Sequence, residues 1–279
     1  MRRRLLGLAA EAWLPVAILL VWWFASASST SAYFPSLRTI AVSFYDTWIS
    51  DRMITDVLPS LGRFVAGFCV ASIIGIALGT VLGTIPTLRR AVDPILDFFR
   101  SLPKPALLPI AIVALGVGDG MKIFIIAFST LWPILLNTID GVRGVDPLLL
   151  EMSRVYGIGR AQRVRRVVLP AASPQIFVGV RVSLSIGLIL MVVSEMVAST
   201  NGLGYFVLLS QQTFAIPEMW AGIILLGVIG YLTNFLFVLA ERRVLAWHKG
   251  WRATALGEAP PMPVPARTTT DTTPPAATA

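Results

Sequence analysis

Two charged side chains lie inside an apolar segment, where ionised groups are rare and usually functional. Arg181 and Glu195 belong to a mostly apolar run from about Pro174 to Ala198. A helix rises about 1.5 Å per residue, so the 14 residues between them correspond to roughly 21 Å and exclude pairing within one helix. Arg181 is close enough to the end of the run to extend its charge to the membrane surface, whereas Glu195 needs a polar partner.

Glu195 comes shortly before Asn201, Gly202 and Gly204, residue types that are typical of a turn. Two interpretations are open. The carboxylate either lines or braces a translocation path, or it hydrogen-bonds the loop that follows. A carboxylate repels anions, so a position on the path would favour a gate over direct anion capture. We treat these four residues as candidate pathway or gate residues.

Other catalytic and ligand-binding chemistries lack their residues. The single cysteine, Cys69, and the single histidine, His248, provide neither an internal disulfide nor a His/Cys metal site. The chain contains no Gly-x4-Gly-Lys-Ser/Thr loop to hold nucleotide phosphates. An intramembrane enzyme would need a nucleophile with a base or a metal set, which this inventory does not favour. We expect no catalytic residue, no metal and no cofactor bound by this chain.

The composition predicts that the surrounding elements lie in a membrane. Of 279 residues, 56% are hydrophobic and 14% are charged, with a mean hydropathy of +0.76. These values disfavour both a disordered chain and an ordinary water-soluble enzyme. The net charge of +8 comes from 23 Lys and Arg against 15 Asp and Glu. Enrichment of Lys and Arg in the loops on the cytoplasmic side of a membrane explains this charge without a nucleic-acid partner.

Six stretches are apolar enough to cross a bilayer, which takes roughly 20 residues. We therefore predict an all-α membrane protein with about six transmembrane helices, near residues 13–29, 61–85, 107–117, 121–137, 174–198 and 219–240. The first stretch could also be a signal peptide, but its bulky Trp22-Trp23-Phe24 favours a retained anchor. The third and fourth are short and contain Pro109 and Pro133, so each could be re-entrant or tilted.

The distribution of charge predicts the topology. Lys and Arg gather in alternate segments between the crossings, at residues 2–4, 89–104, 143–166 and 242–252. By contrast, residues 30–60 hold only Arg38 and Arg52, and residues 199–218 hold neither Lys nor Arg. The positive-inside rule then places both termini in the cytoplasm.

Three regions follow from this layout. Residues 1–55 comprise the N-terminal cytoplasmic end, the first crossing and an outer segment, and residues 56–247 form the transmembrane core. Residues 248–279 are rich in Pro, Thr and Ala, a composition that predicts a disordered cytoplasmic tail.

A ridge of small residues marks the second crossing. Gly67, Ala71, Gly75, Gly79 and Gly83 recur every four residues and so share one helical face. Small residues let another helix backbone approach closely, which is how helices associate in lipid. Packing within one subunit is the favoured interpretation, and a contact between two copies of the chain is the alternative.

The loop between crossings four and five is the most distinctive segment. Glu151 to Gly157 predicts a short amphipathic helix that ends at the glycine, and a basic helix follows it. Pro170 and Pro174 are expected to limit how this second helix continues into crossing five. A helix–turn–helix therefore projects from the membrane. Charge alone would be explained by a basic loop that only enforces topology.

The spacing within this loop resembles the EAA loop of ABC importer permeases. The matching residues are an acidic residue, two small-to-medium residues, a glycine six positions after the acid, and a later Leu-Pro pair: Glu151, Met152, Ser153, Gly157, Leu169 and Pro170. Met152 and Ser153 stand where that motif usually has alanines, and Val167 where isoleucine is common. The resemblance implies that these residues couple an ATPase subunit to the membrane.

The resemblance extends over about residues 33–247 and is strongest to the nitrate/sulfonate/taurine branch. The similar short segments, in order, are Phe34-Pro-Ser36, Leu61 to Gly67, Asp93-Pro94, Ser101-Leu-Pro103, Gly116-Val-Gly118, Gly141-Val142, Glu195-Met196, Gly202-Leu-Gly204 and Trp247. The family implies a type I importer permease fold with coupling helices between helices 4 and 5. It also implies import of a small oxyanion such as sulfonate, taurine or nitrate across a bacterial inner membrane.

The same resemblance implies the partners. They are two cytoplasmic ATPase subunits that carry ATP and Mg, a second permease copy in a homodimer, and an extracytoplasmic solute-binding protein. The alternative is an ion-coupled secondary transporter, in which Glu195, Pro109 and Pro133 would serve ion coupling and the EAA spacing would have no role.

Overall fold

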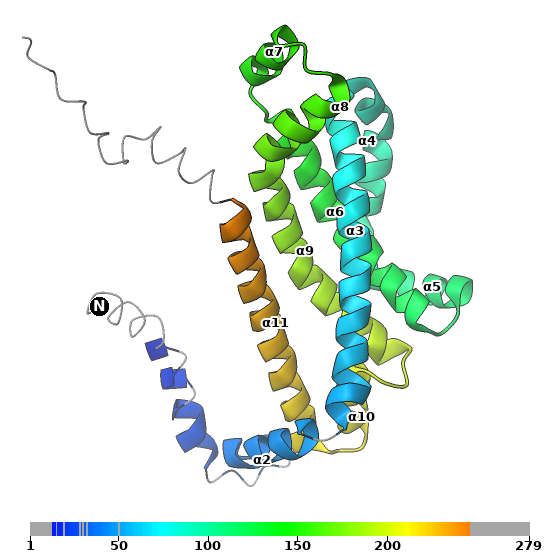
Figure 1. Ribbon diagram of the computed structural model, residues 1–279. Coiled ribbons are helices and arrows are strands. Elements are labelled where there is room, and N and C mark those ends of the chain that lie inside the picture. Colours follow the sequence, from blue (N-terminus) through cyan, green and yellow to red (C-terminus); the bar gives the residue numbers. More distant parts are fainter. Residues whose placement is uncertain are drawn as a thin grey trace, which may run out of the picture.

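The computed structural model describes residues 13–245, apart from positions 15, 19, 28, 30, 32 and 50. That part of the chain is helical and contains no strand, which confirms the all-α class (Figure 1). The basic N-terminal residues 2–4, Trp247 and the predicted tail, 248–279, lie outside the described residues. The elements are α2 (Leu37–Trp48), η1 (Met53–Val57), α3 (Leu58–Thr84), α4 (Pro86–Ser101), η2 (Lys104–Leu107), α5 (Leu108–Leu115), α6 (Asp119–Arg143), α7 (Pro147–Val155), α8 (Arg160–Arg163), η3 (Val164–Val168), α9 (Leu169–Val197), α10 (Leu203–Gln212) and α11 (Ile216–Val244).

Four continuous helical spans within the described residues are long and apolar enough to cross a membrane: Met53–Thr84, Asp119–Arg143, Arg160–Val197 and Ile216–Val244. Helix α6 lies between α3 and α9 and packs against both (Figure 1). The fourth predicted crossing is therefore a full-length helix, because α6 continues through Pro133 for 25 residues. The first predicted crossing, 13–29, includes positions outside the described residues.

The third predicted crossing is wrong in its bounds. Residues 86–104 were expected in a loop, but most of them form α4, which is apolar enough for one span only together with Lys104–Leu115 and meets that segment at 92°. Pro103 forces extended backbone on Leu102, whose ψ is 132°, and so ends α4. Lys104 Nζ then donates to the carbonyls of Phe99, Arg100 and Leu102 at 2.6, 3.0 and 2.9 Å and caps the helix. The segment is thus a broken helix pair.

Hydropathy misses α4 because the helix is amphipathic. One face carries ion pairs of Arg89 with Asp93 and of Arg100 with Asp97, both at 3.3 Å. The adjoining face carries Val92, Leu96 and Phe99, and Leu96 is buried there in an apolar cluster with Leu82 of α3 and residues of α6. The charged face lowers the mean hydropathy while the apolar face is buried against the bundle.

The small-residue ridge of α3 packs against α6 of the same chain. A Cβ built on Gly67 would lie 2.8 Å from the Ile123 carbonyl oxygen, and one on Gly79 would lie 2.6 Å from Thr138 Cβ. Gly75 and Gly83 make similar approaches, and Ala71 is buried. The glycines therefore allow the α3 and α6 backbones to lie close together, as the within-subunit interpretation requires.

Replacing Gly79 by alanine is expected to destabilise the protein by about 1–3 kcal/mol, because the added methyl overlaps Thr138 between two packed backbones. The matched control is Gly62→Ala on the same helix, where a Cβ meets nothing within 4 Å. There the better helix propensity of alanine should leave stability unchanged or raise it by about 0.5–1 kcal/mol. Thermal unfolding of both variants in detergent tests this, and equal stabilities would contradict the close-packing interpretation.

The bundle has two distinct ends. Helices α7 and α8 and the start of α4 gather at one end, and α2 and α10 lie at the other (Figure 1); we call them the α7 end and the α10 end. Helix α2 packs against α11, where the Trp48 indole N–H donates to the Ala221 carbonyl at 3.3 Å. Helix α2 is thus attached to the last helix.

Candidate functional site

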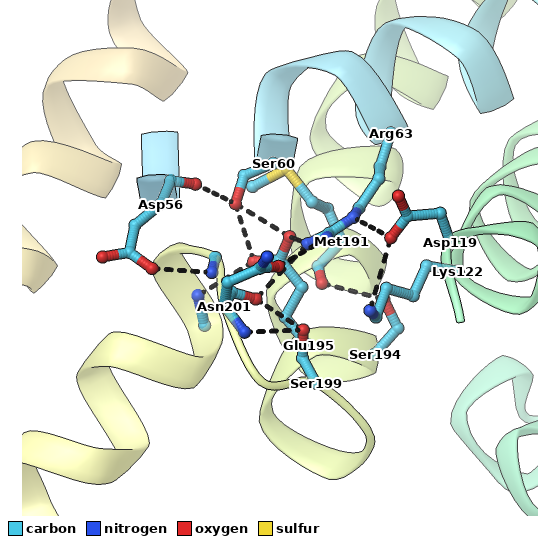
Figure 2. Close-up of polar contacts among 12 residues, drawn as sticks. Asp56, Ser60, Arg63, Asp119, Lys122, Met191, Ser194, Glu195, Ser199 and Asn201 are labelled. Carbon is cyan, nitrogen blue, oxygen red and sulfur yellow. Dashed lines mark hydrogen bonds and ion pairs between the residues drawn. The ribbon is translucent and has the colours of Figure 1, made fainter. Parts of the chain in front are cut away.

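A largely buried polar cluster lies at the α10 end and joins three segments that are far apart in the sequence (Figure 2). Its residues come from η1, α3, α6, α9 and the loop between α9 and α10: Asp56, Ser60, Arg63, Asp119, Lys122, Glu195 and Asn201. We call this set the α10-end polar cluster. It contains Glu195 and Asn201 of the candidate pathway or gate residues.

Glu195 is the centre of the cluster and is fully buried, at 0% exposure. Its Oε1 accepts from Arg63 Nη1 at 2.8 Å, and its Oε2 accepts from the Gly204 N–H at 3.0 Å. Ser60 Oγ lies 2.8 and 2.9 Å from the two carboxylate oxygens and accepts from the Leu203 N–H at 2.9 Å. The carboxylate is therefore tied to both α3 and the start of α10.

Arg63 links three parts of the molecule with one guanidinium. Besides Glu195, it donates through Nε to Asp119 Oδ1 at 2.8 Å and through Nη2 to Asn201 Oδ1 at 2.6 Å. Lys122, one turn along α6, lies 3.6 Å from the same Asp119 oxygen. The planar fork of donors on arginine suits this arrangement, whereas a lysine could not satisfy three directions in the same way.

The loop between α9 and α10 depends on two glycines. Gly202 has a φ of +111°, and its N–H donates to Asp56 Oδ1 at 2.9 Å. A Cβ at Gly202 would lie 2.6 Å from the Glu195 carboxyl carbon. A Cβ at Gly204 would collide with the Val192 carbonyl oxygen. Glycine is needed at both positions because the loop lies directly on the carboxylate.

Charges in and beside the cluster balance. Arg52, Arg63 and Lys122 face Asp56, Asp119 and Glu195 through ion pairs of 2.8–3.6 Å. Removing one partner from such a buried arrangement leaves an uncompensated charge, which costs far more than the intact pair contributes. The geometry fits the second interpretation of Glu195, a carboxylate that holds the following loop. In this conformation the carboxylate faces no open path.

Sequence reasoning missed Asp56, Ser60, Asp119 and the partner of Glu195. One signal was available for the partner: Arg63 stands inside the apolar run 61–85, and an intramembrane arginine requires a counter-charge. In the structure Glu195 and Arg63 are each other's partners, as their ion pair shows. Arg181, in contrast, is exposed on α9.

The projecting loop at the α7 end folds as a short helix with well-defined ends. Asp146 caps α7 by accepting from the Leu148 N–H at 2.8 Å. At the other end Gly157 has a φ of +67°, its N–H donates to the Arg154 carbonyl at 2.9 Å, and the Ile158 N–H donates to the Ser153 carbonyl at 3.0 Å. This is a Schellman motif, so the prediction that Gly157 ends the helix is confirmed.

Helix α7 presents an apolar face away from the bundle. Leu148, Met152, Val155 and Tyr156 are 60%, 47%, 85% and 77% exposed, and Glu151 is also exposed on this helix. Ser153 is buried on the opposite face. A contiguous exposed apolar face on a projecting helix is typical of a protein interaction site.

The second, basic helix of the loop is continuous with crossing five, contrary to the expectation that the prolines would limit this passage. The π-helical turn η3 joins α8 to α9, and the Leu169 N–H donates to the Val164 carbonyl five residues back. Pro170 then falls in the first turn of α9, where the lack of an N–H does not matter. Leu150 of α7 and Leu169, the first residue of α9, both pack on an apolar cluster formed mainly by α6 and α9 residues, so α7 is in contact with two spans.

Long apolar spans, a polar cluster at one end and a projecting helix with an exposed apolar face at the other define a multi-pass membrane protein with a candidate site for a partner protein. The comparisons agree. Residues 71–246 match the family of binding-protein-dependent transport system inner membrane components. The chain belongs to this family and is the membrane-spanning permease subunit of an ABC importer.

Relatives with named substrates show that the chain is similar to the nitrate/sulfonate/taurine branch of the family. The chain is 30% identical over 239 residues to the nitrate import permease protein NrtB of Synechocystis sp., covering 82% of this chain and 87% of the relative. It is 32% identical over 189 residues to the taurine transport system permease protein TauC of Escherichia coli, covering 68% and 69%. An inward-facing structure of the MetNI methionine ABC transporter superposes with a TM-score of 0.57 at 25% identity, over 68% of this chain and 94% of that chain.

Proposed function

We propose that the chain forms a homodimeric pathway for a small oxyanion, with two ATPase subunits and an extracytoplasmic binding protein. The observation that carries the coupling role is the exposed apolar face of α7, which is tied through Leu150 to α6 and α9. ATP and Mg would be held by the ATPase subunits, since this chain has no phosphate-binding loop. Closure of the ATPase pair would draw two α7 helices together and move the attached spans.

Each candidate coupling residue has a distinct place in this proposal. Met152 contributes to the docking face, Glu151 offers a charge beside it, and Ser153 anchors the helix from its buried side. Gly157 sets the direction in which the chain leaves α7, and Leu169 and Pro170 begin the span that receives the movement.

The α10-end polar cluster supplies a rigid part in the same proposal. Glu195, Asn201, Gly202 and Gly204 hold the start of α10 on α3 and α6, so the spans would tilt as a unit. The cluster then braces the outer gate, and it does not contact the solute.

We further propose that the α7 end and both termini face the cytoplasm, as the Lys and Arg distribution predicts. In a Cys69→Ala background, a cysteine at exposed Gln211 of α10 should react with an impermeant thiol reagent in intact cells, and one at exposed Arg160 should react only after permeabilisation. Labelling of position 160 from outside would overturn this orientation.

Relatives named for nitrate and taurine suggest that the solute carries a compact oxyanion group. The experiment is uptake into proteoliposomes that contain this chain, its ATPase and its binding protein, after the ligand retained by the binding protein is identified by mass spectrometry. Uptake should require ATP and all three proteins. Uptake driven by an ion gradient without the ATPase would instead establish the secondary-transporter alternative.

Replacing the binding protein by one of different specificity should change the solute that is imported. An unchanged substrate preference would show that the permease itself selects the ligand.

A further inference from the structure

A cavity at the α7 end is lined by arginines that neither the coupling role nor the polar cluster uses. It has a volume of about 570 Å³ and lies between the ends of α3 and α6, the inner face of α7, and the α8–η3 segment. Four guanidinium side chains line it: Arg143, Arg154, Arg160 and Arg163. We call this cavity the arginine pocket.

The arginine pocket lacks internal counter-charge. Its lining contains no carboxylate, and within the described part of the chain the side chains of Arg143, Arg154 and Arg160 make no hydrogen bond or ion pair. Arg163 donates through Nη2 to the Ile158 carbonyl at 3.0 Å, but its Nε is buried without a partner among the described residues. A buried unpaired donor on a charged group is costly. Arg163 has such a donor, and the exposed cations Arg143, Arg154 and Arg160 surround the same cavity, so the lining favours an anionic occupant.

An adjoining cavity of about 290 Å³ extends the positive charge. It shares Gly83 and Arg143 with the arginine pocket and adds Arg89 and Arg90. Its carboxylate, Asp93, is occupied by an ion pair with Arg89 at 3.3 Å. The combined region is therefore strongly cationic. Its cations are arginines, whose paired N–H donors match the oxygens of a phosphate group.

The position of the pocket along the membrane spans indicates the source of the anion. Thr84 and Arg143, which line it, are the last residues of two membrane spans, so the pocket lies at the level where lipid headgroups meet the protein. Apolar side chains of Ile85, Val142 and Val168 complete the wall. The face of α7 that turns inward carries Leu150 and Arg154 one turn apart, while its docking face points the other way.

We propose that the arginine pocket binds the phosphate group of an acidic phospholipid, which would fix the inner face of the coupling helix to the membrane. Basic pockets between transmembrane helices on the cytoplasmic side suit such headgroups. The inference rests on the proposed orientation, which places this end at the inner leaflet.

The test is lipid retention by the purified full-length chain, measured by native mass spectrometry with phosphatidylglycerol or phosphatidylcholine. Each direct hydrogen bond from a pocket arginine to the lipid phosphate is worth about fivefold in affinity, so Arg143→Gln with Arg160→Gln should weaken phosphatidylglycerol binding roughly 25-fold. The matched control is Arg165→Gln with Arg166→Gln, which removes the same charge from exposed neighbours that do not line the pocket. Its phosphatidylglycerol binding should stay within about twofold of the unaltered chain.

Three results would overturn the proposal. The first is equal retention of the two lipids by the unaltered chain. The second is an equal loss of phosphatidylglycerol binding in the pocket and control variants. The third is complete displacement of the lipid by millimolar inorganic phosphate, which would assign the pocket to a soluble oxyanion. Lipid retention is measured without the ATPase and binding protein, whereas ATP-dependent uptake is measured with them. A failure of one assay therefore leaves the other interpretable.

Discussion

Replacing Arg63 by alanine is expected to lower the free energy of unfolding by about 3–5 kcal/mol, which is a large fraction of the stability of a typical domain. The guanidinium is buried and bonds Glu195, Asp119 and Asn201 together. Its loss leaves the Glu195 carboxylate charged in a site with 0% exposure and only neutral donors around it. The loop that begins α10 should loosen at the same time.

Unfolding in detergent by increasing denaturant measures this effect. The matched control is Arg181→Ala, which removes an exposed arginine from a membrane span and should change stability by less than about 0.5 kcal/mol. Arg63→Gln and Glu195→Gln should each destabilise as well, and the two combined should cost less than the sum of these single changes, since the paired charges leave together. Additive effects, or an Arg63→Ala variant as stable as the control, would contradict the clamp.

Replacing Gly157 by valine should reduce ATP-dependent uptake at least tenfold while leaving the amount of membrane-inserted protein unchanged. The φ of +67° at this position is an outlier for a β-branched residue and costs about 1–3 kcal/mol. The chain relieves this strain by abandoning the Schellman turn, which redirects the segment between α7 and α8. In the proposed coupling role, the exposed apolar face of α7 is then misplaced relative to the ATPase and the spans.

Gly159→Val is the matched control for this prediction. Gly159 lies two residues away, also in open space, but has a φ of −58° and a ψ of 155°, which valine adopts readily. Uptake should remain within about twofold of the unaltered chain. Normal uptake by Gly157→Val would remove the coupling role from this turn, and ATPase activity that no longer responds to the loaded binding protein would locate the defect in coupling.

The family, the fold class and the end of α7 could all be predicted from sequence because each depends on local properties. Hydropathy over about 20 residues locates a membrane span, and α3, α6, α9 and α11 are found where such windows occur. Gly157 could be assigned because a helix end with positive φ requires glycine whatever surrounds it. The spacing from Glu151 to Pro170 belongs to one continuous stretch of chain.

Contacts between distant segments were decided only by the tertiary structure. The ridge of α3 could have faced a second copy of the chain, and it is the packing on α6 that occupies it. The broken helix pair of α4 and α5 escaped hydropathy because α4 is amphipathic, and its apolar face is recognised only by the helices that cover it. Arg63 and Glu195 stand 132 positions apart, and no local pattern shows that two buried charges will meet. The sequence alone indicates that each of these charges needs a counter-charge. The packing of α3 against α6 and α9 determines which residue supplies it, because an ion pair forms only where the fold brings the two groups within a few ångströms.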